Sequence, residues 1–141
     1  MSHKETPIGF EPLPHQDPFL ETIGTFLKKE TEQGWIVGIS IEEKHCNGRK
    51  IAHGGLISTL ADVCLAYGCT YSQTPPLHMV TAHKNIDFLG MVVEGQWLEA
   101  HLTIRKKGKS LFFADADIIA SNKLVARASG VINVLPNQVI N

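Results

Sequence analysis

Apolar and polar positions alternate along this chain with two periods, one typical of helices and the other of strands. Near the N-terminus the helical period predicts a short amphipathic helix at residues 18–32, from the apolar positions Phe19, Ile23, Phe26 and Leu27. Asp17 suits its N-cap, Pro18 suits its first turn, and Gly34 is a suitable stop. In the next segment, 35–41, an apolar side chain recurs at every second position, which predicts a strand.

A second helical segment, residues 53–68, is apolar on nearly every face. A helix of this kind is surrounded by other structure and does not lie on a surface. Four strands are expected after it, within residues 79–88, 97–104, 112–118 and 124–134. The apolar residues of the first of these strands are expected to share one face: Val80, Ala82, Ile86 and Phe88.

The order of these elements predicts the architecture. Consecutive strands joined by tight turns imply an antiparallel sheet. Since nothing else in the chain covers the apolar helix, the sheet must curl around it. We therefore expect an α+β fold in which a five-stranded antiparallel sheet wraps one long buried helix, with a short helix before it. Residues 1–17 are expected to form an irregular arm, 18–135 the single domain and 136–141 a tail.

Charge and cysteine content exclude several classes of protein. Thirteen Lys and Arg residues stand against fourteen Asp and Glu, for a net charge of −1, whereas nucleic-acid binders are usually basic. The three cysteines form no disulfide framework, which favours a reducing, cytoplasmic compartment. The first residues show no signal-peptide core, and the uncharged stretch 51–61 is too short to span a membrane. We expect a soluble protein with no nucleic-acid or membrane partner.

Asp62 is the one formal charge among residues 51–83, inside the predicted apolar helix. An ionised carboxylate in apolar surroundings is destabilising unless it is paired or hydrogen-bonded. Such a group is a candidate general base. The alternative is that Asp62 lies on a helix face that reaches solvent or a subunit interface.

His53, Gly54 and Gly55 stand at the start of the same helix. Two glycines leave backbone N–H groups uncovered, and the helix dipole adds roughly half a positive charge there. This suits an oxyanion hole, although a flexible loop-to-helix junction is the simpler interpretation. Asp62 lies roughly 10 Å beyond Gly55 along the helix axis, so one carbonyl cannot reach both groups in one chain. If both act on one substrate, two subunits must face each other, which predicts a homodimer with two shared sites.

These residues resemble the hotdog-fold thioesterases, in particular the PaaI-like branch that includes phenylacetyl-CoA and hydroxybenzoyl-CoA thioesterases. The family motif, H-x-N-x-x-G-x-x-H-G-G with Asp or Glu seven residues after the second Gly, is matched by His45, Asn47, His53, Gly54, Gly55 and Asp62. The resemblance covers residues 35–134 and includes Asn85 and the basic turn 106–109. Lys50 departs from the motif, because the family usually has Gly there. Gly48 is a candidate to form that turn instead.

The resemblance implies a catalytic set of Asp62, Gly54, Gly55, His53, Asn47 and Thr81. The carboxylate would be the nucleophile or the general base toward water, and a glycine N–H would polarise the thioester carbonyl. His53 and Asn47 would position the carbonyl and the water, which Thr81 would help to hold. Candidates for binding substrate and CoA are His45, Arg49, Lys50, Asn85, Lys106, Lys107, Gly108 and Lys109. For the basic turn, a solvated hairpin tip is the alternative.

Together these observations predict an acyl-CoA thioesterase that releases a free acid and CoA and needs no metal or redox cofactor. The histidines and cysteines lack zinc-site spacing, and Cys64 and Cys69 are expected to pack in the core. The resemblance implies self-association as a homodimer, or as a tetramer of two dimers. Two alternatives stay open: a non-catalytic hotdog protein that binds acyl-CoA or another small ligand, and a hotdog hydratase of enoyl thioesters.

Overall fold

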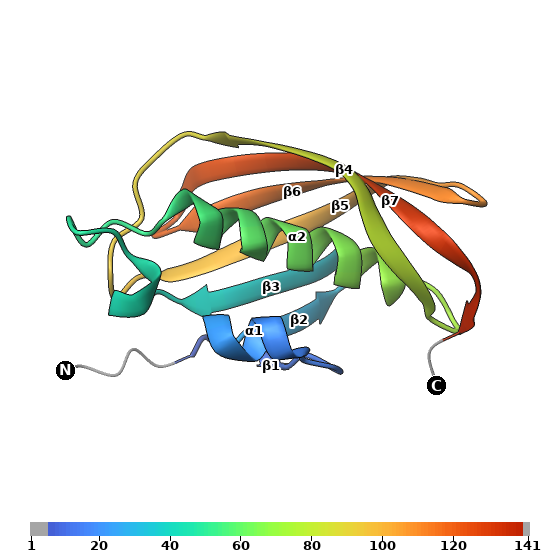
Figure 1. The fold of residues 1–141 in the computed structure, drawn as a ribbon, viewed down its shortest axis with the longest axis horizontal. Coiled ribbons are helices and arrows are strands. Elements are labelled where there is room, and N and C mark those ends of the chain that lie inside the picture. Colours follow the sequence, from blue (N-terminus) through green and yellow to red (C-terminus); the bar gives the residue numbers. More distant parts are fainter. Residues whose placement is uncertain (1–5, 140–141) are drawn as a thin grey trace.

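One antiparallel sheet curves around one long helix in the computed structural model, which describes residues 6–139 (Figure 1). The elements in chain order are β1 (Glu11–Pro12), α1 (Pro18–Ile23), β2 (Leu27–Thr31), β3 (Gly34–Ser40), the 3-10 helix η1 (Glu43–His45), α2 (Gly54–Thr70), β4 (Leu77–Phe88), β5 (Trp97–Lys107), β6 (Leu111–Ala120) and β7 (Lys123–Val139). The strand order is β1-β2-β3-β5-β6-β7-β4, so β1 and β4 are the edges.

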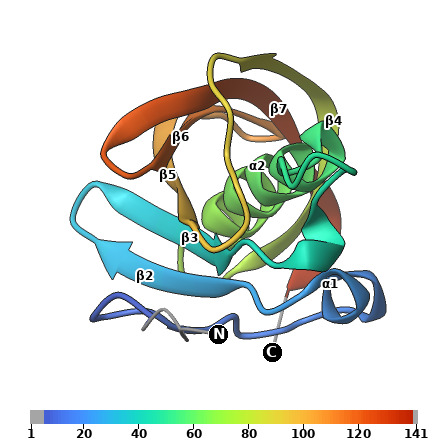
Figure 2. The ribbon, with the colours of Figure 1, turned by 90° about the vertical axis from the view of Figure 1, so that its left-hand side faces the viewer.

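The sheet encloses α2 as the sequence predicts. Figure 2, which views α2 nearly end-on, shows the strands passing around the helix from β2 and β3 through β5, β6 and β7 to β4. The described residues form seven strands where five were expected. The two additional strands, β1 and β2, extend the sheet past β3, and β1 contains only two residues.

The first helix is shorter than its apolar spacing predicts. The expected N-cap is present, since the Asp17 carboxylate accepts a hydrogen bond of 2.9 Å from the Leu20 amide. However, α1 ends at Ile23, and Leu27–Thr31 form β2. Gly24 interrupts the helix, and β2 pairs with β3 along its whole length. The strand ladder therefore outweighs a local spacing that suits a helix, because helix propensity is a weak preference.

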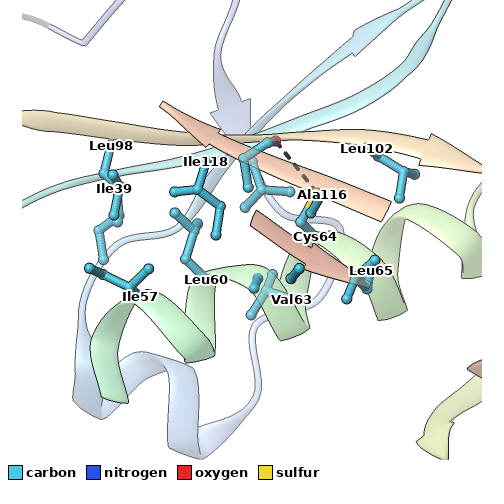
Figure 3. Packing of buried hydrophobic residues seen from close by; sticks show 14 of the residues in the cluster. Ile39, Ile57, Leu60, Val63, Cys64, Leu65, Leu98, Leu102, Ala116 and Ile118 are labelled. Atoms are coloured by element: carbon cyan, nitrogen blue, oxygen red, sulfur yellow. Dashed lines mark hydrogen bonds between the residues drawn. The ribbon is translucent and has the colours of Figure 1, made fainter. Parts of the chain in front are cut away.

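The core lies between α2 and the concave face of the sheet. Figure 3 shows Leu60 and Cys64 of α2 directed towards the strands that carry Leu98 and Ile118. All four side chains are fully buried. The Cys64 thiol also contacts the Ala100 backbone oxygen at 3.4 Å. The apolar side chains from which the helix and the strands are predicted are therefore the ones that pack between them.

One stripe of α2 is less enclosed than the sequence predicts. Its residues are partly exposed and lie between α1 and β4: Ser58, Thr59, Asp62, Ala66 and Tyr67. The helix is therefore wrapped by the sheet as expected, except along this stripe. The sheet covers the apolar majority of the helix, and the stripe that contains its one charged residue stays accessible in the single chain.

A bulge in β4 changes which of its residues face α2. Its pairing with β7 shifts just after Thr81, so that Ala82 is an extra residue. As a result Thr81 and Lys84, three residues apart, both face the helix. The expected single apolar face is therefore wrong, because Val80 lies on the opposite face of the sheet from Ile86.

The boundaries of the folded region extend beyond those expected. Glu11 and Pro12 of the N-terminal arm pair with β2. At the other end β7 continues to Val139, past the expected domain end at 135. Residues 1–5 of the arm and 140–141 of the tail lie outside the described residues. Between residues 6 and 139, no helix is long and apolar enough to cross a membrane.

Candidate active site

Asp62 lies on the accessible stripe of α2, next to β4. Thr81 Oγ1 donates a hydrogen bond of 2.9 Å to Asp62 Oδ1. The Lys84 Nζ atom lies 4.0 Å from the same oxygen and donates a hydrogen bond of 3.0 Å to the Ser58 backbone oxygen. The Asp62 side chain is 45% exposed. Of the two interpretations left open by the sequence, the structure favours the second: Asp62 is hydrogen-bonded and lies on a helix face that reaches solvent in the single chain.

A pocket of about 210 Å³ opens beside Asp62. It is bounded by α1, by the accessible stripe of α2 and by β4, and is lined by Asp17, Phe19, Leu20, Ser58, Thr59, Asp62, Val63, Ala66, Tyr67 and Lys84. Burial, followed by the nearby Asp17 carboxylate, raises the pKa of Tyr67 to about 12, so its phenol stays protonated at neutral pH. The pocket thus offers two carboxylates, an ammonium group and a phenol beside apolar side chains.

Sequence reasoning missed Lys84 and the residues of α1 as part of this site. The sequence does contain a feature that could have pointed to Lys84, because it is a lysine within a strand that is expected to be apolar on one face. Simple alternation does not place it opposite Asp62, because the bulge after Thr81 changes the register. The contribution of α1 is a tertiary contact that leaves no local pattern.

The N-terminus of α2 carries two free backbone donors. His53 is the N-cap, but its side chain makes no capping hydrogen bond. The two amides after the glycines donate to the His53 backbone oxygen, at 3.0 and 3.2 Å. Among residues 6–139, the N–H groups of Gly54 and Gly55 have no acceptor. The Phe88 ring packs against the first glycine, where a Cβ atom would lie 3.3 Å from Phe88 Cζ.

These donors and the carboxylate do not meet within one chain. Neither Gly54 nor Gly55 lines the pocket beside Asp62. The two groups lie on one helix, and the rise of roughly 1.5 Å per residue keeps them apart. The described residues therefore hold a carboxylate and a pair of free amide donors that are separate in the single chain.

Asn47 builds the turn that precedes α2. Its Oδ1 atom accepts hydrogen bonds from the amides of Arg49 and Ile51, at 2.8 and 3.2 Å. Lys50 adopts φ 62, the left-handed conformation that glycine adopts most easily. Lys50 thus forms the turn itself, and Gly48, whose φ is not in the left-handed region, does not replace the family's glycine. A contact between Asn47 and substrate or water stays a prediction.

His45 has a structural role. Its Nδ1 atom accepts a hydrogen bond of 2.9 Å from the Glu42 amide, so Nε2 carries the proton and donates to the Ile23 backbone oxygen at 2.6 Å. Its own backbone oxygen accepts from the His53 amide at 2.8 Å. The ring is buried and both nitrogens are engaged. His45 therefore joins α1 and η1 to the start of α2, and a contact of this residue with substrate or CoA stays a prediction.

The basic candidates for CoA binding lie at opposite ends of α2. Arg49 and Lys50 are exposed just before the helix begins. The turn 106–109 lies beyond its C-terminal end, where Lys107 Nζ donates a hydrogen bond of 2.7 Å to the Ser72 backbone oxygen. One chain does not bring these groups together, and their role in CoA binding stays a prediction.

The remaining candidates lie away from the pocket. Asn85 pairs with Ser129 on the face of the sheet directed away from α2. Cys64 and Cys69 are buried in the core as expected, and burial raises the pKa of the Cys69 thiol to about 12. Neither thiol is therefore an available nucleophile. In the part of the chain that the structure describes, no group of three His, Cys, Asp or Glu side chains is arranged to hold a metal ion.

Comparison with known proteins identifies the family. Residues 50–126 match the thioesterase superfamily. A Pseudomonas aeruginosa protein named "Putative esterase PA0474" is 43% identical over 91% of this chain and 96% of its own length. The acyl-coenzyme A thioesterase PaaI of Escherichia coli is 28% identical over 84% of this chain and 82% of its own length. This chain belongs to the thioesterase superfamily.

Solved structures agree with this assignment. The structure of the E. coli PaaI protein from the phenylacetic acid degradation operon matches this fold with a TM-score of 0.70, at 28% identity over 77% of this chain and 78% of that chain. The expected hotdog fold and PaaI-like relationship are thereby confirmed.

Proposed function

We propose that this protein hydrolyses an acyl-CoA thioester to a free acid and CoA. The observation that carries the proposal is the combination of a hydrogen-bonded, accessible Asp62 with two unpaired amide donors, Gly54 and Gly55, on one helix of a thioesterase-superfamily chain. The names of its relatives, an esterase and an acyl-coenzyme A thioesterase, support the same reaction class.

Asp62 acts on the thioester carbonyl in one of two ways. As a general base it takes a proton from water while the water oxygen bonds to the carbonyl carbon. As a nucleophile it forms an acyl anhydride, which water then hydrolyses. In both routes the carbonyl oxygen becomes negative and accepts a hydrogen bond from the Gly54 or Gly55 amide, and the C–S bond breaks with release of the CoA thiolate. Thr81 holds Oδ1 of the carboxylate, which leaves Oδ2 for the reaction.

A second copy of the chain completes the site in this proposal. β4 is a 12-residue edge strand, and its inner face carries Thr81 next to Asp62. A long unpaired edge is a ready template for another strand. Pairing of two β4 edges in a homodimer places the carboxylate of one chain opposite the α2 N-terminus of the other. Arg49 and Lys50, beside that N-terminus, then have the charge to bind CoA phosphates. A further dimer of dimers stays a prediction.

A panel of acyl-CoA esters with detection of free thiol tests the activity. The proposal predicts thiol release from at least one ester, with the free acid as the second product. Tight binding of the esters without thiol release would instead favour the non-catalytic binder. Consumption of an enoyl-CoA without thiol release would favour the hydratase.

Asp62→Asn tests the role of the carboxylate. The amide keeps the shape of the side chain and can still contact Thr81, but it neither takes a proton nor attacks a carbonyl. We expect kcat to fall by at least about 10²-fold, within the usual range for loss of a general base, with an unchanged unfolding transition. The matched control is Asp117→Asn, which removes an exposed carboxylate from the outer face of β6 and is expected to keep full activity. Full hydrolysis by Asp62→Asn would contradict the mechanism.

A further inference from the structure

Lys84 is the one charged residue that β4 directs towards α2 between Met79 and Phe88. The other inward positions in this interval are Met79, Thr81, Ile86 and Phe88. A lysine at such a position is unusual, because an ammonium group that loses water needs compensating partners. The bulge after Thr81 is what turns Lys84 inward.

The partners of Lys84 are the backbone of α2 and the carboxylate of Asp62. The side chain is 20% exposed, and Nζ donates a hydrogen bond of 3.0 Å to the Ser58 oxygen, one turn before Asp62. The distance from Nζ to Asp62 Oδ1 is 4.0 Å, which is an electrostatic contact and not a hydrogen bond. Thr81 donates to the same oxygen. Both groups from β4 therefore act on one side of the carboxylate, and within residues 6–139 Oδ2 accepts no hydrogen bond.

We propose that Lys84 is a positioning residue for the hydrolysis, an inference that rests on the proposed function. Its ammonium group, fixed to the helix backbone, attracts Oδ1 of Asp62 and, together with Thr81, holds the carboxylate in one rotamer. Oδ2 is thereby directed into the pocket that Lys84 itself lines. Fixed orientation of a reacting group contributes strongly to rate, and a displacement of about 1 Å can lower it by about 10²-fold.

A purely structural role for Lys84 predicts different behaviour. Inward-pointing charges on edge strands can serve to discourage pairing between edges. In that case removal of the charge would change self-association or stability and leave the chemical step intact. The positioning role predicts the reverse: a slower chemical step in a protein whose assembly and unfolding transition are unchanged.

Lys84→Ala in the full-length protein separates the two roles. We expect kcat to fall by about 10- to 100-fold while KM changes less than about threefold, because the variant loses orientation of the carboxylate and not substrate affinity. Lys84→Arg keeps the charge and is expected to recover most of the loss. The matched control is Lys123→Ala, which removes an exposed lysine from the first position of β7 and is expected to keep wild-type kinetics.

Chemical rescue gives a readout that a structural role would not change. Ethylammonium is small enough to occupy the space left in Lys84→Ala, and we expect it to raise kcat in a saturable manner. Tetramethylammonium at equal ionic strength, which cannot donate a hydrogen bond to the Ser58 oxygen, should have no effect. Wild-type kcat in Lys84→Ala, or a loss that neither arginine nor ethylammonium restores, would overturn the inference. The proposed function fails separately, if the wild-type protein releases no thiol.

Discussion

Asp62 and its neighbours show what single residues contribute to the site. The sequence singles out Asp62 as an isolated charge, and the structure adds that Thr81 and Lys84 bind one side of it from β4. The same motif contains residues whose side chains shape the segment before α2. His45 and Asn47 match the family pattern, yet their side chains make hydrogen bonds that fold the segment before α2. A motif alone does not separate residues that touch a substrate from residues that shape the loop.

Lys50 gives a prediction at the residue scale. Its left-handed φ of 62 is unfavourable for any side chain with a Cβ atom, by about 1–2 kcal/mol, whereas glycine adopts it freely. The greater entropy of glycine in the unfolded chain offsets part of this gain. We therefore expect Lys50→Gly to raise the free energy of unfolding by about 0.5–1 kcal/mol in urea titrations. Arg49→Gly, at a neighbouring exposed position outside the left-handed region, should lower it instead. A destabilised Lys50→Gly would contradict this explanation of the turn.

The elements differ in how much of their structure the sequence predicts. α2 is predicted correctly because its apolar side chains satisfy both the helical period and the core. The segment after Ile23 is predicted wrongly, because pairing with β3 outweighs the local spacing. The bulge in β4 is not predictable from alternation, since one extra residue, Ala82, reverses the faces of those that follow it. That bulge also explains why Lys84 is absent from the predicted site.

Leu60 tests the packing of α2 against the sheet. Its side chain is fully buried between the helix and the strands (Figure 3). Leu60→Ala removes this contact and leaves a cavity, so we expect the free energy of unfolding to fall by about 2–5 kcal/mol. Thr59→Ala, one residue away on the accessible stripe, should change it by less than about 0.5 kcal/mol. Urea titrations of all variants at equal protein concentration check this, and equal effects of the two substitutions would contradict the division of α2 into a core face and an open stripe.

At the scale of the whole molecule, one chain encloses α2 in its sheet but keeps the candidate catalytic groups apart. The sheet curves around α2, and the apolar core lies within one chain. The carboxylate and the amide donors, however, lie at different points along one helix, and only the carboxylate lines the pocket. The rise of a helix per residue makes this separation predictable from sequence, whereas the open edge of β4 that can bring a second copy to the site is known only from the strand order.

The central claim is that each active site combines Asp62 of one chain with the α2 N-terminus of another, where Gly54 is the donor that a substitution can remove. Gly54→Pro removes that N–H at the first helical position, where proline is tolerated, and Gly54→Ala controls for the added Cβ atom next to Phe88. The decisive measurement is the acyl-CoA hydrolysis rate of purified heterodimers that contain one Asp62→Asn chain and one Gly54→Pro chain, each inactive as a homodimer. A shared site predicts about half of the wild-type activity, because one of the two sites is intact. Heterodimers as inactive as both parents would contradict it.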